Sequence, residues 1–387
     1  MQSSETHIPA ILANSPISLI CGAGALDRVA EAAPVAVSRR TLVVTDPAIR
    51  AAGHAERLLT TLRSGGRLIE VFDGVEPNPT SETIRRGAAI ARQFSPDTII
   101  GLGGGSAMDA AKGVNLLFRA GGEISEYRGD PPLNVLNGRP PLLPMVLIPT
   151  TAGTGSEAQS FALISDSETH LKLACGDRRS PGGLRPVATV LDPDLTATMP
   201  RSVAAATGLD ALSHAVETAG CRIRSERSLA FSREAWARLA GAFERSLRST
   251  GDIEARGDML LGAHLAGCAI EASMLGAAHA CANPLTARFD LTHGFAVGVM
   301  LPHVIRFNGE GAAESPYAAL DPSAESLARR FDDALAVAEA PRRLRDIGVA
   351  EAALEGLASL AATQWTASFN PRPVTREDLL EIYRRAW

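Results

Sequence analysis

The first half of the chain alternates between short apolar runs and longer stretches with helical spacing. The apolar runs lie at residues 17–21, 41–46, 67–73, 98–102 and 145–149, and each has the length of a strand. Between them lie Ala- and Arg-rich stretches, such as 49–65 and 80–94, that predict helices. Alternation of strands and helices is typical of a mainly parallel sheet covered by helices. We therefore predict an α/β domain.

The pattern changes after the segment LDPDLTATMP at 191–200. Long segments with helical periodicity follow at 201–219, 225–247 and 252–275, and strand-like runs nearly disappear. Prolines interrupt the chain at the transition, so we predict an α/β domain at 1–195 and an all-helical domain at 196–387. Segments 121–143 and 309–322, rich in Gly, Pro, Asp and Glu, are predicted to be long loops.

A glycine-rich turn follows the apolar run at 98–102. Gly103, Gly104 and Gly105 are consecutive, and Ser106 opens a predicted amphipathic helix. Consecutive glycines let backbone N–H groups approach an anion closely, and a helix N-terminus adds partial positive charge. The turn therefore predicts a diphosphate site, although it is neither the GxGxxG fingerprint nor a P-loop, and a plain tight turn is the alternative.

Four potential metal ligands lie in the second half of the chain. Asp210 and His214 are four residues apart in GLDALSHAVE, which places both on one face of a helix. His279 and His293 lie in HACANPLTARFDLTH, and no hydrophobic stripe explains them. Three imidazoles and one carboxylate suit Fe(II) or Zn(II) better than Ca(II) or Mg(II), and such an ion is a Lewis acid that polarises a carbonyl. The alternative is a helix-surface Asp–His pair beside two unrelated histidines.

The order of these motifs resembles the iron-containing (group III) alcohol dehydrogenases over nearly the whole chain. The resemblance rests on the segments VVTD at 43–46, PNPT at 77–80, GGGSAMDAAK at 103–112, IPTTAGTGSE at 148–157, LDPDL at 191–195, GLDALSHAVE at 208–217, HACANPLTARFDLTHG at 279–294 and LPHVIRFN at 301–308. It implies NAD(P) on the α/β domain, Fe(II) bound by Asp210, His214, His279 and His293, and an active site in the cleft between the domains. Zn(II), Mn(II) or Co(II) would satisfy the same ligands.

Asp46 bears on the choice of cofactor. It ends the predicted strand at 41–46, where the adenosine ribose lies in sheets of this kind. A carboxylate there accepts hydrogen bonds from both ribose hydroxyls and repels a 2′-phosphate, which favours NAD(H) over NADP(H). The alternative is an aspartate that starts the turn before Pro47.

The resemblance extends the expected cofactor shell to further residues: Asn78, Gly103, Gly104, Gly105, Ser106, Asp109, Thr150, Thr151 and Lys172. For Asp109 an ion pair with Lys112, three residues later on the predicted helix, is an equal alternative. For Lys172 the alternative is a solvated surface lysine.

One position departs from the family. Many members carry a further histidine four residues after the third ligand, near the nicotinamide, and here that position is Asn283. An asparagine can hydrogen-bond the substrate or the carboxamide, but it cannot transfer a proton at neutral pH. We expect Asn283 to belong to the catalytic residues together with the four ligands, and proton transfer to go through water or ribose hydroxyls.

Composition narrows the partners and the compartment. The chain has 387 residues, enough for two cores, and its net charge of −5 favours neither nucleic acid nor an anionic membrane. Its five cysteines are scattered and odd in number, which is typical of reduced, cytoplasmic thiols, and no basic segment precedes the first apolar stretch as in a signal peptide. The resemblance also implies a homo-oligomer, most simply a homodimer.

Three activities are compatible with this pattern. The resemblance favours an NAD-dependent alcohol dehydrogenase or aldehyde reductase that moves hydride between the nicotinamide and a small alcohol or aldehyde. A maleylacetate reductase is the nearest alternative, although its glycine motif usually lacks the full GGGSxxDxAK form. A dehydroquinate synthase-type lyase would need basic residues for a phosphorylated sugar acid, and residues 201–300 offer few near the ligands.

Overall fold

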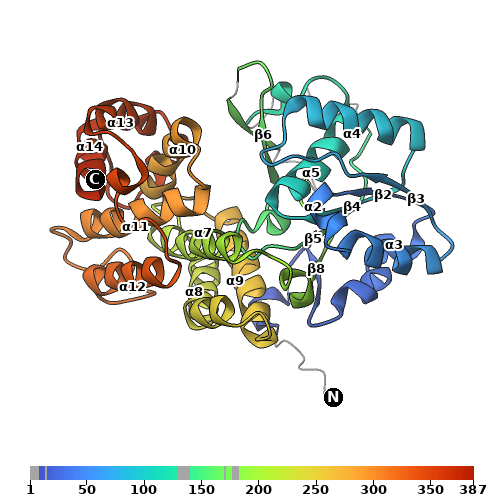
Figure 1. The fold of residues 1–387 in the computed structure, drawn as a ribbon, viewed down its shortest axis with the longest axis horizontal. Coiled ribbons are helices and arrows are strands. Elements are labelled where there is room, and N and C mark those ends of the chain that lie inside the picture. The colour runs from blue at the N-terminus through green and yellow to red at the C-terminus, as the bar shows by residue number, and fades with distance from the viewer. Residues whose placement is uncertain (1–7, 14, 130–139, 170, 177–182) are drawn as a thin grey trace. The chain divides into compact units, whose positions relative to one another are not determined.

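The computed structural model describes residues 8–13, 15–129, 140–169, 171–176 and 183–387. The chain divides into two compact units. The first contains Met1–Thr151 and Ser156–Thr198, and the second contains Ala152–Gly155 and Met199–Trp387. Figure 1 shows that the first unit is built around a sheet and that the second is helical, which confirms the predicted fold class.

The sheet of the first unit has six parallel strands in the order β1-β8-β5-β4-β2-β3. Their bounds are β1 Ser18–Cys21, β2 Arg40–Val44, β3 Leu68–Phe72, β4 Thr98–Gly103, β5 Met145–Pro149 and β8 Ala188–Leu191. The central strands β4 and β5 are buried along their whole length, as expected for a parallel sheet covered on both faces. The edge strand β3 alternates between exposed and less exposed residues, with Leu68 exposed.

Helices cover both faces of this sheet, and successive strand residues face opposite cores. Leu42 and Val44 of β2 belong to the core under α4 (Ser81–Phe94) and α5 (Gly105–Ala120). Val43 belongs to the other core, with Leu58 of α3 (His54–Ser64). The remaining short helices among the described residues of this unit are η1 Ala10–Leu12, η2 Ala25–Glu31, α1 Ala33–Val37, α2 Pro47–Ala51, η3 Ile124–Tyr127, η4 Ser156–Ala158 and η5 Pro193–Thr196.

Two features of the first unit differ from the prediction. The single helix predicted at 49–65 is wrong, because α2 ends at Ala51 and α3 begins at His54. Gly53 between them has φ +83°, a left-handed conformation that ends a helix. The sequence pattern also missed β8 and the antiparallel ribbon of β6 (Phe161–Ser165) and β7 (Lys172–Gly176).

The predicted long loops fall partly within the described residues. The predicted loop 121–143 contains η3, and its residues 130–139 lie outside the part of the chain that the structure describes. Residues 310–322, all of them described, contain no helix or strand.

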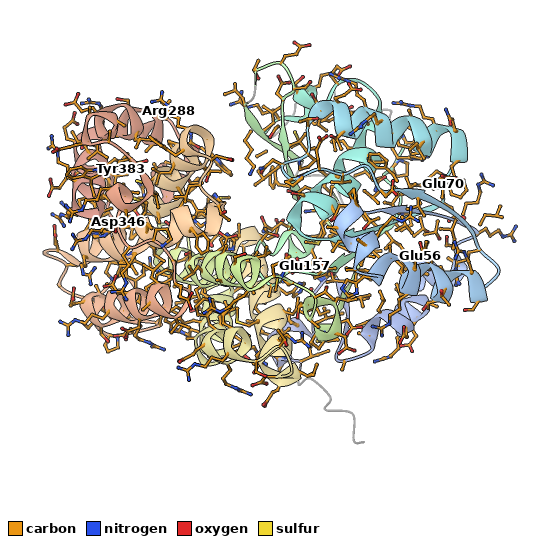
Figure 2. The ribbon with its side chains drawn as sticks, in the orientation of Figure 1. Glu56, Glu70, Glu157, Arg288, Asp346 and Tyr383 are labelled. Carbon is orange, nitrogen blue, oxygen red and sulfur yellow. The ribbon has the colours of Figure 1, made fainter. Side chains whose placement is uncertain are left out.

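The second unit consists of helices around a buried central helix. Its helices are α7 Arg201–Gly220, α8 Glu226–Arg248, α9 Ile253–Glu271, α10 Ala277–Phe289, α11 His293–Gly309, α12 Ala324–Val337, α13 Leu354–Ala362 and α14 Arg376–Ala386, with η6 Leu344–Ile347, η7 Glu351–Ala353 and η8 Trp365–Phe369. From Gly208 to Gly220 every residue of α7 is buried, and α8, α9 and α11 pack against it. Tyr383 of α14, labelled in Figure 2, donates a hydrogen bond of 2.6 Å to the Cys281 carbonyl of α10.

Glycines explain why Ala152–Gly155 belongs to the helical unit. A Cβ added to Gly153 would lie 2.7 Å from the side chain of Thr207 in α7. A Cβ added to Gly155 would lie 2.7 Å from the Cα of Gly267 in α9. The segment therefore lies directly against two helices, at a distance that only glycine permits.

Among the described residues, no helix combines the length and the apolar character needed to cross a membrane. All five cysteines are free thiols.

Candidate active site

One face of α7 carries three buried polar side chains. Asp210, His214 and Glu217 follow one another at intervals of four and three residues, which places them in a row along the helix. Each of them is at most 5% exposed. Carboxylates and imidazoles are buried in such a position only when partners or an ion compensate for the lost water.

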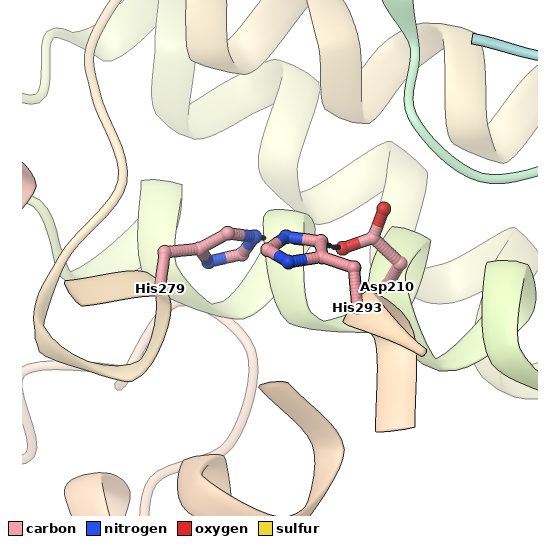
Figure 3. Close-up of side chains that lie close together, drawn as sticks. All are labelled: Asp210, His279 and His293. Carbon is pink, nitrogen blue, oxygen red and sulfur yellow. Dashed lines mark ion pairs between the residues drawn. The ribbon is translucent and has the colours of Figure 1, made fainter. Parts of the chain in front are cut away.

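Two histidines from other helices meet this row. His279 lies in the first turn of α10, and His293 is the first residue of α11. The Oδ1 atom of Asp210 lies 3.5 Å from Nε2 of His279 and 3.9 Å from Nε2 of His293. Figure 3 shows these three side chains converging, and their ligand atoms all lie within 4.8 Å of one another.

His214 completes the cluster from the side of α7. Its Nε2 atom lies 3.4 Å from Oδ1 of Asp210, and its ring stacks on that of His279 with centroids 4.9 Å apart. The structure thus brings together all four residues that were proposed as ligands from the sequence. The ligand atoms that all lie within 4.8 Å of one another are those of Asp210, His279 and His293, and His214 lies beside them.

The cluster leaves buried polar atoms without hydrogen bonds. Oδ1 of Asp210 and Nε2 of His279 are buried, and apart from their 3.5 Å ion pair with each other neither has a hydrogen-bond partner among the described residues. Unsatisfied buried polar atoms are uncommon in folded proteins and need an explanation. Imidazole nitrogens and a carboxylate oxygen that converge on one point are the ligand set of a divalent transition metal, so these residues fit such an ion.

Charges within the cluster support the same interpretation. Burial opposes ionisation of Asp210, but the surrounding imidazoles outweigh it and lower the pKa of this carboxyl group. Burial lowers the pKa of His214 below its usual value. Burial also acts to lower the pKa of His279, but Glu217 and Asp210 outweigh it and raise this pKa to about 9. A bound cation would displace that proton, because an imidazole ligates in its neutral form.

Three neighbours of the cluster were missed from the sequence. Glu217 binds His279 and the N-terminus of α10. Thr286 places Oγ1 3.5 Å from Nδ1 of His293. Gln364 accepts a 3.0 Å hydrogen bond from the side-chain amide of Asn283. Of the three, only Glu217 could have been found from the sequence, because it lies one further turn along the helix from Asp210 and His214.

In the first unit, the glycine-rich turn joins β4 to α5. Gly103 has φ +147°, Gly104 precedes α5 as its N-cap and Gly105 is its first residue. A Cβ added to Gly103 would lie 3.1 Å from Oδ2 of Asp46, and one added to Gly104 would lie 3.5 Å from the side chain of Thr151. Asp46 therefore lies beside the turn, while its Oδ1 caps α2 by accepting from the Ile49 N–H at 2.9 Å.

Three other proposed cofactor residues lie close together near the same helix end. The Asn78 N–H donates to Ser106 Oγ at 3.2 Å, and Lys172 Nζ donates to Asn78 Oδ1 at 3.4 Å. Thr150 donates its N–H to the Gly103 carbonyl at 3.0 Å, and its buried hydroxyl finds no hydrogen-bond partner in the described part of the chain. No acidic residue of α5 itself lies in its first turn, so the N-terminus of this helix keeps its partial positive charge.

Asp109 has structural partners. Its two carboxylate oxygens accept from Ser156 Oγ at 2.6 Å and from the Leu163 N–H at 2.9 Å. Lys112 is completely buried and donates to the carbonyl oxygens of Ser156 and Phe161, at 2.7 Å each. Lys112 Nζ also lies 3.6 Å from Asp109 Oδ1, which is the ion pair expected as the alternative to a cofactor role. Together the two side chains hold η4 and β6 against α5.

Comparisons with known proteins agree with this geometry. The family model described as "Iron-containing alcohol dehydrogenase" matches residues 16–193, and "Fe-containing alcohol dehydrogenase family, C-terminal" matches residues 204–387. The chain is 31% identical to the 1,3-propanediol dehydrogenase of Klebsiella pneumoniae, covering 95% of this chain and 96% of that protein. It is 29% identical to the NAD-dependent methanol dehydrogenase of Bacillus methanolicus, and the alignment covers 96% of this chain and 98% of that protein.

A solved structure extends the similarity to three dimensions. The crystal structure of a 1,3-propanediol oxidoreductase superposes with a TM-score of 0.87 at 30% identity, covering 96% of this chain and 98% of that one. The two family models together span both units of the chain, and the relatives align with it along almost their entire length. This protein therefore belongs to the iron-containing alcohol dehydrogenase family, whose members are NAD-dependent oxidoreductases.

Proposed function

We propose that the protein interconverts a small primary alcohol and its aldehyde, with NAD(H) as the hydride carrier and a divalent metal, Fe(II) or Zn(II), in the helical unit. The observation that carries this proposal is the buried cluster of Asp210, His214, His279 and His293. Its converging ligand atoms include two that form no hydrogen bond with any described residue. These two atoms lie 3.5 Å apart, which is too long for a good hydrogen bond, and a metal ion bound by both would satisfy them.

The four side chains would hold the metal, with Asp210 supplying the negative charge and the histidines neutral nitrogen ligands. A metal bound there would supply Lewis acidity, which polarises the oxygen of the substrate. Asp210, His214 and His279 are buried, so the protein excludes water from most of the cluster. The side chain of His293 is 33% exposed and is the most accessible of the four, so we place the substrate on its side.

Asn283 is proposed to contact the substrate or the carboxamide from α10. Gln364 accepts one of its amide hydrogens, which defines the side-chain amide orientation and leaves its oxygen as an acceptor. Asn283 holds no proton that it can release near neutral pH, so we expect proton transfer through water or ribose hydroxyls.

The first unit is proposed to bind NAD(H). The turn at Gly103–Gly105 would receive the diphosphate at the N-terminus of α5, with Ser106, Thr150 and Thr151 beside it. Asp46 would accept from the adenosine ribose, and its charge would oppose the 2′-phosphate of NADP(H). Asn78 and Lys172 would approach the nicotinamide half of the molecule.

The substrate class is supported by the relatives. Those with similar sequences include dehydrogenases named for methanol and for 1,3-propanediol, both of which are small primary alcohols. We extend this class to the present chain without choosing among its members.

The test is NADH oxidation by the Fe(II)-loaded or Zn(II)-loaded protein with a panel of small aldehydes. We expect turnover with at least one aldehyde, weaker turnover with NADPH, and none in the His279→Ala variant. In Asn283→His, we expect the pH profile of kcat/KM to gain an ionisation near the ordinary pKa of histidine, about 6.5, that the parent lacks.

Equal activity in the parent and in His279→Ala would contradict the metal site. A protein that binds metal and NAD(H) but reduces none of the aldehydes would point to the lyase alternative. An unchanged pH profile in Asn283→His would show that this position does not contact the reacting groups.

A further inference from the structure

We infer that Glu217 is a positioning residue that fixes the tautomer and the direction of the His279 ring. This inference rests on the proposed function, because it concerns how the proposed ligand His279 is presented to a metal. Glu217 itself lies behind that histidine, on the side away from Asp210.

Both carboxylate oxygens of Glu217 are engaged by α10. Oε2 forms a hydrogen bond with Nδ1 of His279, and Oε1 accepts from the Ala278 N–H at 2.8 Å. The Glu217 side chain is only 2% exposed, so water does not compete for either contact. A single buried carboxylate therefore binds the backbone of Ala278 and the side chain of His279, which follow one another in the chain.

The consequence for His279 follows from the chemistry of imidazole. A neutral ring that donates its Nδ1–H to a carboxylate carries its lone pair on Nε2. Nε2 is the atom that lies 3.5 Å from Oδ1 of Asp210 and that forms no hydrogen bond within the described ranges. Glu217 thus selects the tautomer in which the atom facing the cluster can bind a metal, and a charged partner of this kind also makes that nitrogen more basic.

The same carboxylate holds the start of α10 in place. The N-cap of α10 is Gly276, which has no side chain to cap the helix. A Cβ at Gly276 would lie 3.0 Å from Oε1 of Glu217, so the glycine also makes room for the carboxylate. A negative charge at a helix N-terminus is stabilising, and this arrangement couples the position of His279 to that of α7.

Asn370 provides a matched control at the same helix end. Its Oδ1 accepts from the Ala277 N–H at 3.3 Å, and it makes no hydrogen bond to His279 among the contacts of the described residues. Asn370→Ala therefore weakens the start of α10, and removes the hydrogen bonds of Asn370 to Asn308 and Arg372, without removing the partner of the histidine. Glu217→Gln keeps the size of the side chain but has only one acceptor oxygen for two donors, so one of the two contacts is lost.

The experiment compares the parent protein, Glu217→Gln and Asn370→Ala. For each we would measure the Zn(II) affinity, by competition with a chromophoric chelator, and the melting temperature of the metal-free protein. Glu217→Gln is expected to bind Zn(II) about 10- to 100-fold more weakly than the parent. Asn370→Ala is expected to melt at a lower temperature and to keep the Zn(II) affinity of the parent.

Different failures have different meanings. A parent protein that binds neither Zn(II) nor Fe(II) would overturn the proposed function. A parent that binds Zn(II) as tightly as Glu217→Gln does would overturn the role of Glu217 alone. Equal weakening in Glu217→Gln and Asn370→Ala would show that only the helix end matters, which also overturns it.

A measurement on the parent protein covers the case in which Glu217→Gln does not fold. The ¹⁵N spectrum of the Zn(II)-loaded, histidine-labelled protein reports the tautomer of each ring, and His279→Ala identifies the signal of that residue. We expect a protonated Nδ1 and a metal-bound Nε2. The opposite assignment would overturn the inference.

Discussion

At the scale of single residues, Asp46 combines two roles that one substitution can separate. Its Oδ1 caps α2, and its Oδ2 lies beside Gly103 at the glycine-rich turn. Asparagine caps helices as well as aspartate does, so Asp46→Asn should keep α2 intact. It should also remove the charge that opposes a 2′-phosphate. We therefore expect the ratio of kcat/KM for NADPH to that for NADH to rise roughly tenfold or more.

The measurement is steady-state kinetics with both cofactors, alongside the melting temperature. Asp46→Ala serves as the comparison, because it also removes the cap and should lower stability by about 1 kcal/mol. If the cofactor ratio of Asp46→Asn equals that of the parent, Asp46 is only a cap.

At the scale of elements, the close contact between α7 and α11 positions His293. A Cβ on Gly294 would lie 1.9 Å from the carbonyl oxygen of Ala206, a backbone atom of α7 that cannot move aside. Gly294→Ala must therefore push α11 away and displace the adjacent His293. We expect a loss of about 1–3 kcal/mol in the free energy of unfolding and weaker Zn(II) binding.

Gly298, one turn further along α11, gives the control for this substitution. A Cβ there would meet the end of Leu335 at 3.0 Å, which can adjust. Because alanine is about 1 kcal/mol more favourable than glycine within a helix, Gly298→Ala should keep both stability and metal affinity. Urea unfolding and chelator competition would check both variants, and equal effects of the two substitutions would refute the argument.

The packing of α11 also predicts a pH dependence of stability. Burial, aided by the charges of Arg306 and Arg385 and opposed by Asp332, lowers the pKa of His303 to about 4. The unfolded chain, with the ordinary value of 6.5, then takes up a proton before the folded one does. The stability that the neutral His303 contributes to the folded protein is therefore fully present above pH 6.5. It is lost as the pH falls towards 4, by an amount on the order of 2–3 kcal/mol.

His303→Gln removes the titrating group and should flatten this part of the stability curve. The measurement is the free energy of unfolding in urea at pH 7 and at pH 4.5, for the parent and the variant without metal. Subtracting the change in the free energy of unfolding of the variant from that of the parent removes the contributions of the other histidines. If both lose the same stability on acidification, His303 does not contribute.

At the scale of the whole molecule, the proposed metal ligands and the proposed NAD(H) residues belong to different units. The four ligands lie on α7, α10 and α11, and the glycine-rich turn lies between β4 and α5. A ligand stabilises the structure that binds it against local unfolding. We expect Zn(II) alone to slow amide hydrogen exchange in those three helices and NADH alone to slow it around Gly103–Ser106.

Hydrogen exchange followed by mass spectrometry would resolve these segments. His279→Ala is the control for the metal, because it should lose the Zn(II) effect and keep the NADH effect. Protection by Zn(II) confined to the first unit would contradict the assignment of the ligands.

Much of the architecture could be predicted from the sequence. The five strands predicted in the first unit and the first three helices of the second follow from periodicity, because burial on one or both faces leaves a repeating pattern. The split between α2 and α3 was missed, since Gly53 interrupts an otherwise helical pattern with a single left-handed residue. The ribbon of β6 and β7 was missed because its residues pair with each other and with α5 through contacts that no local pattern records.

For the candidate site, the sequence by itself determined the kinds of ligand, the Asp210–His214 spacing on one helix face and the glycine turn before α5. These are properties of neighbouring residues on one element. Only the tertiary structure decided that His279 and His293 meet Asp210, that Glu217 lies behind His279, and that Asp109 binds Ser156 and Leu163. Each of these joins residues distant in the chain, and such contacts depend on how helices pack rather than on the pattern within any one of them.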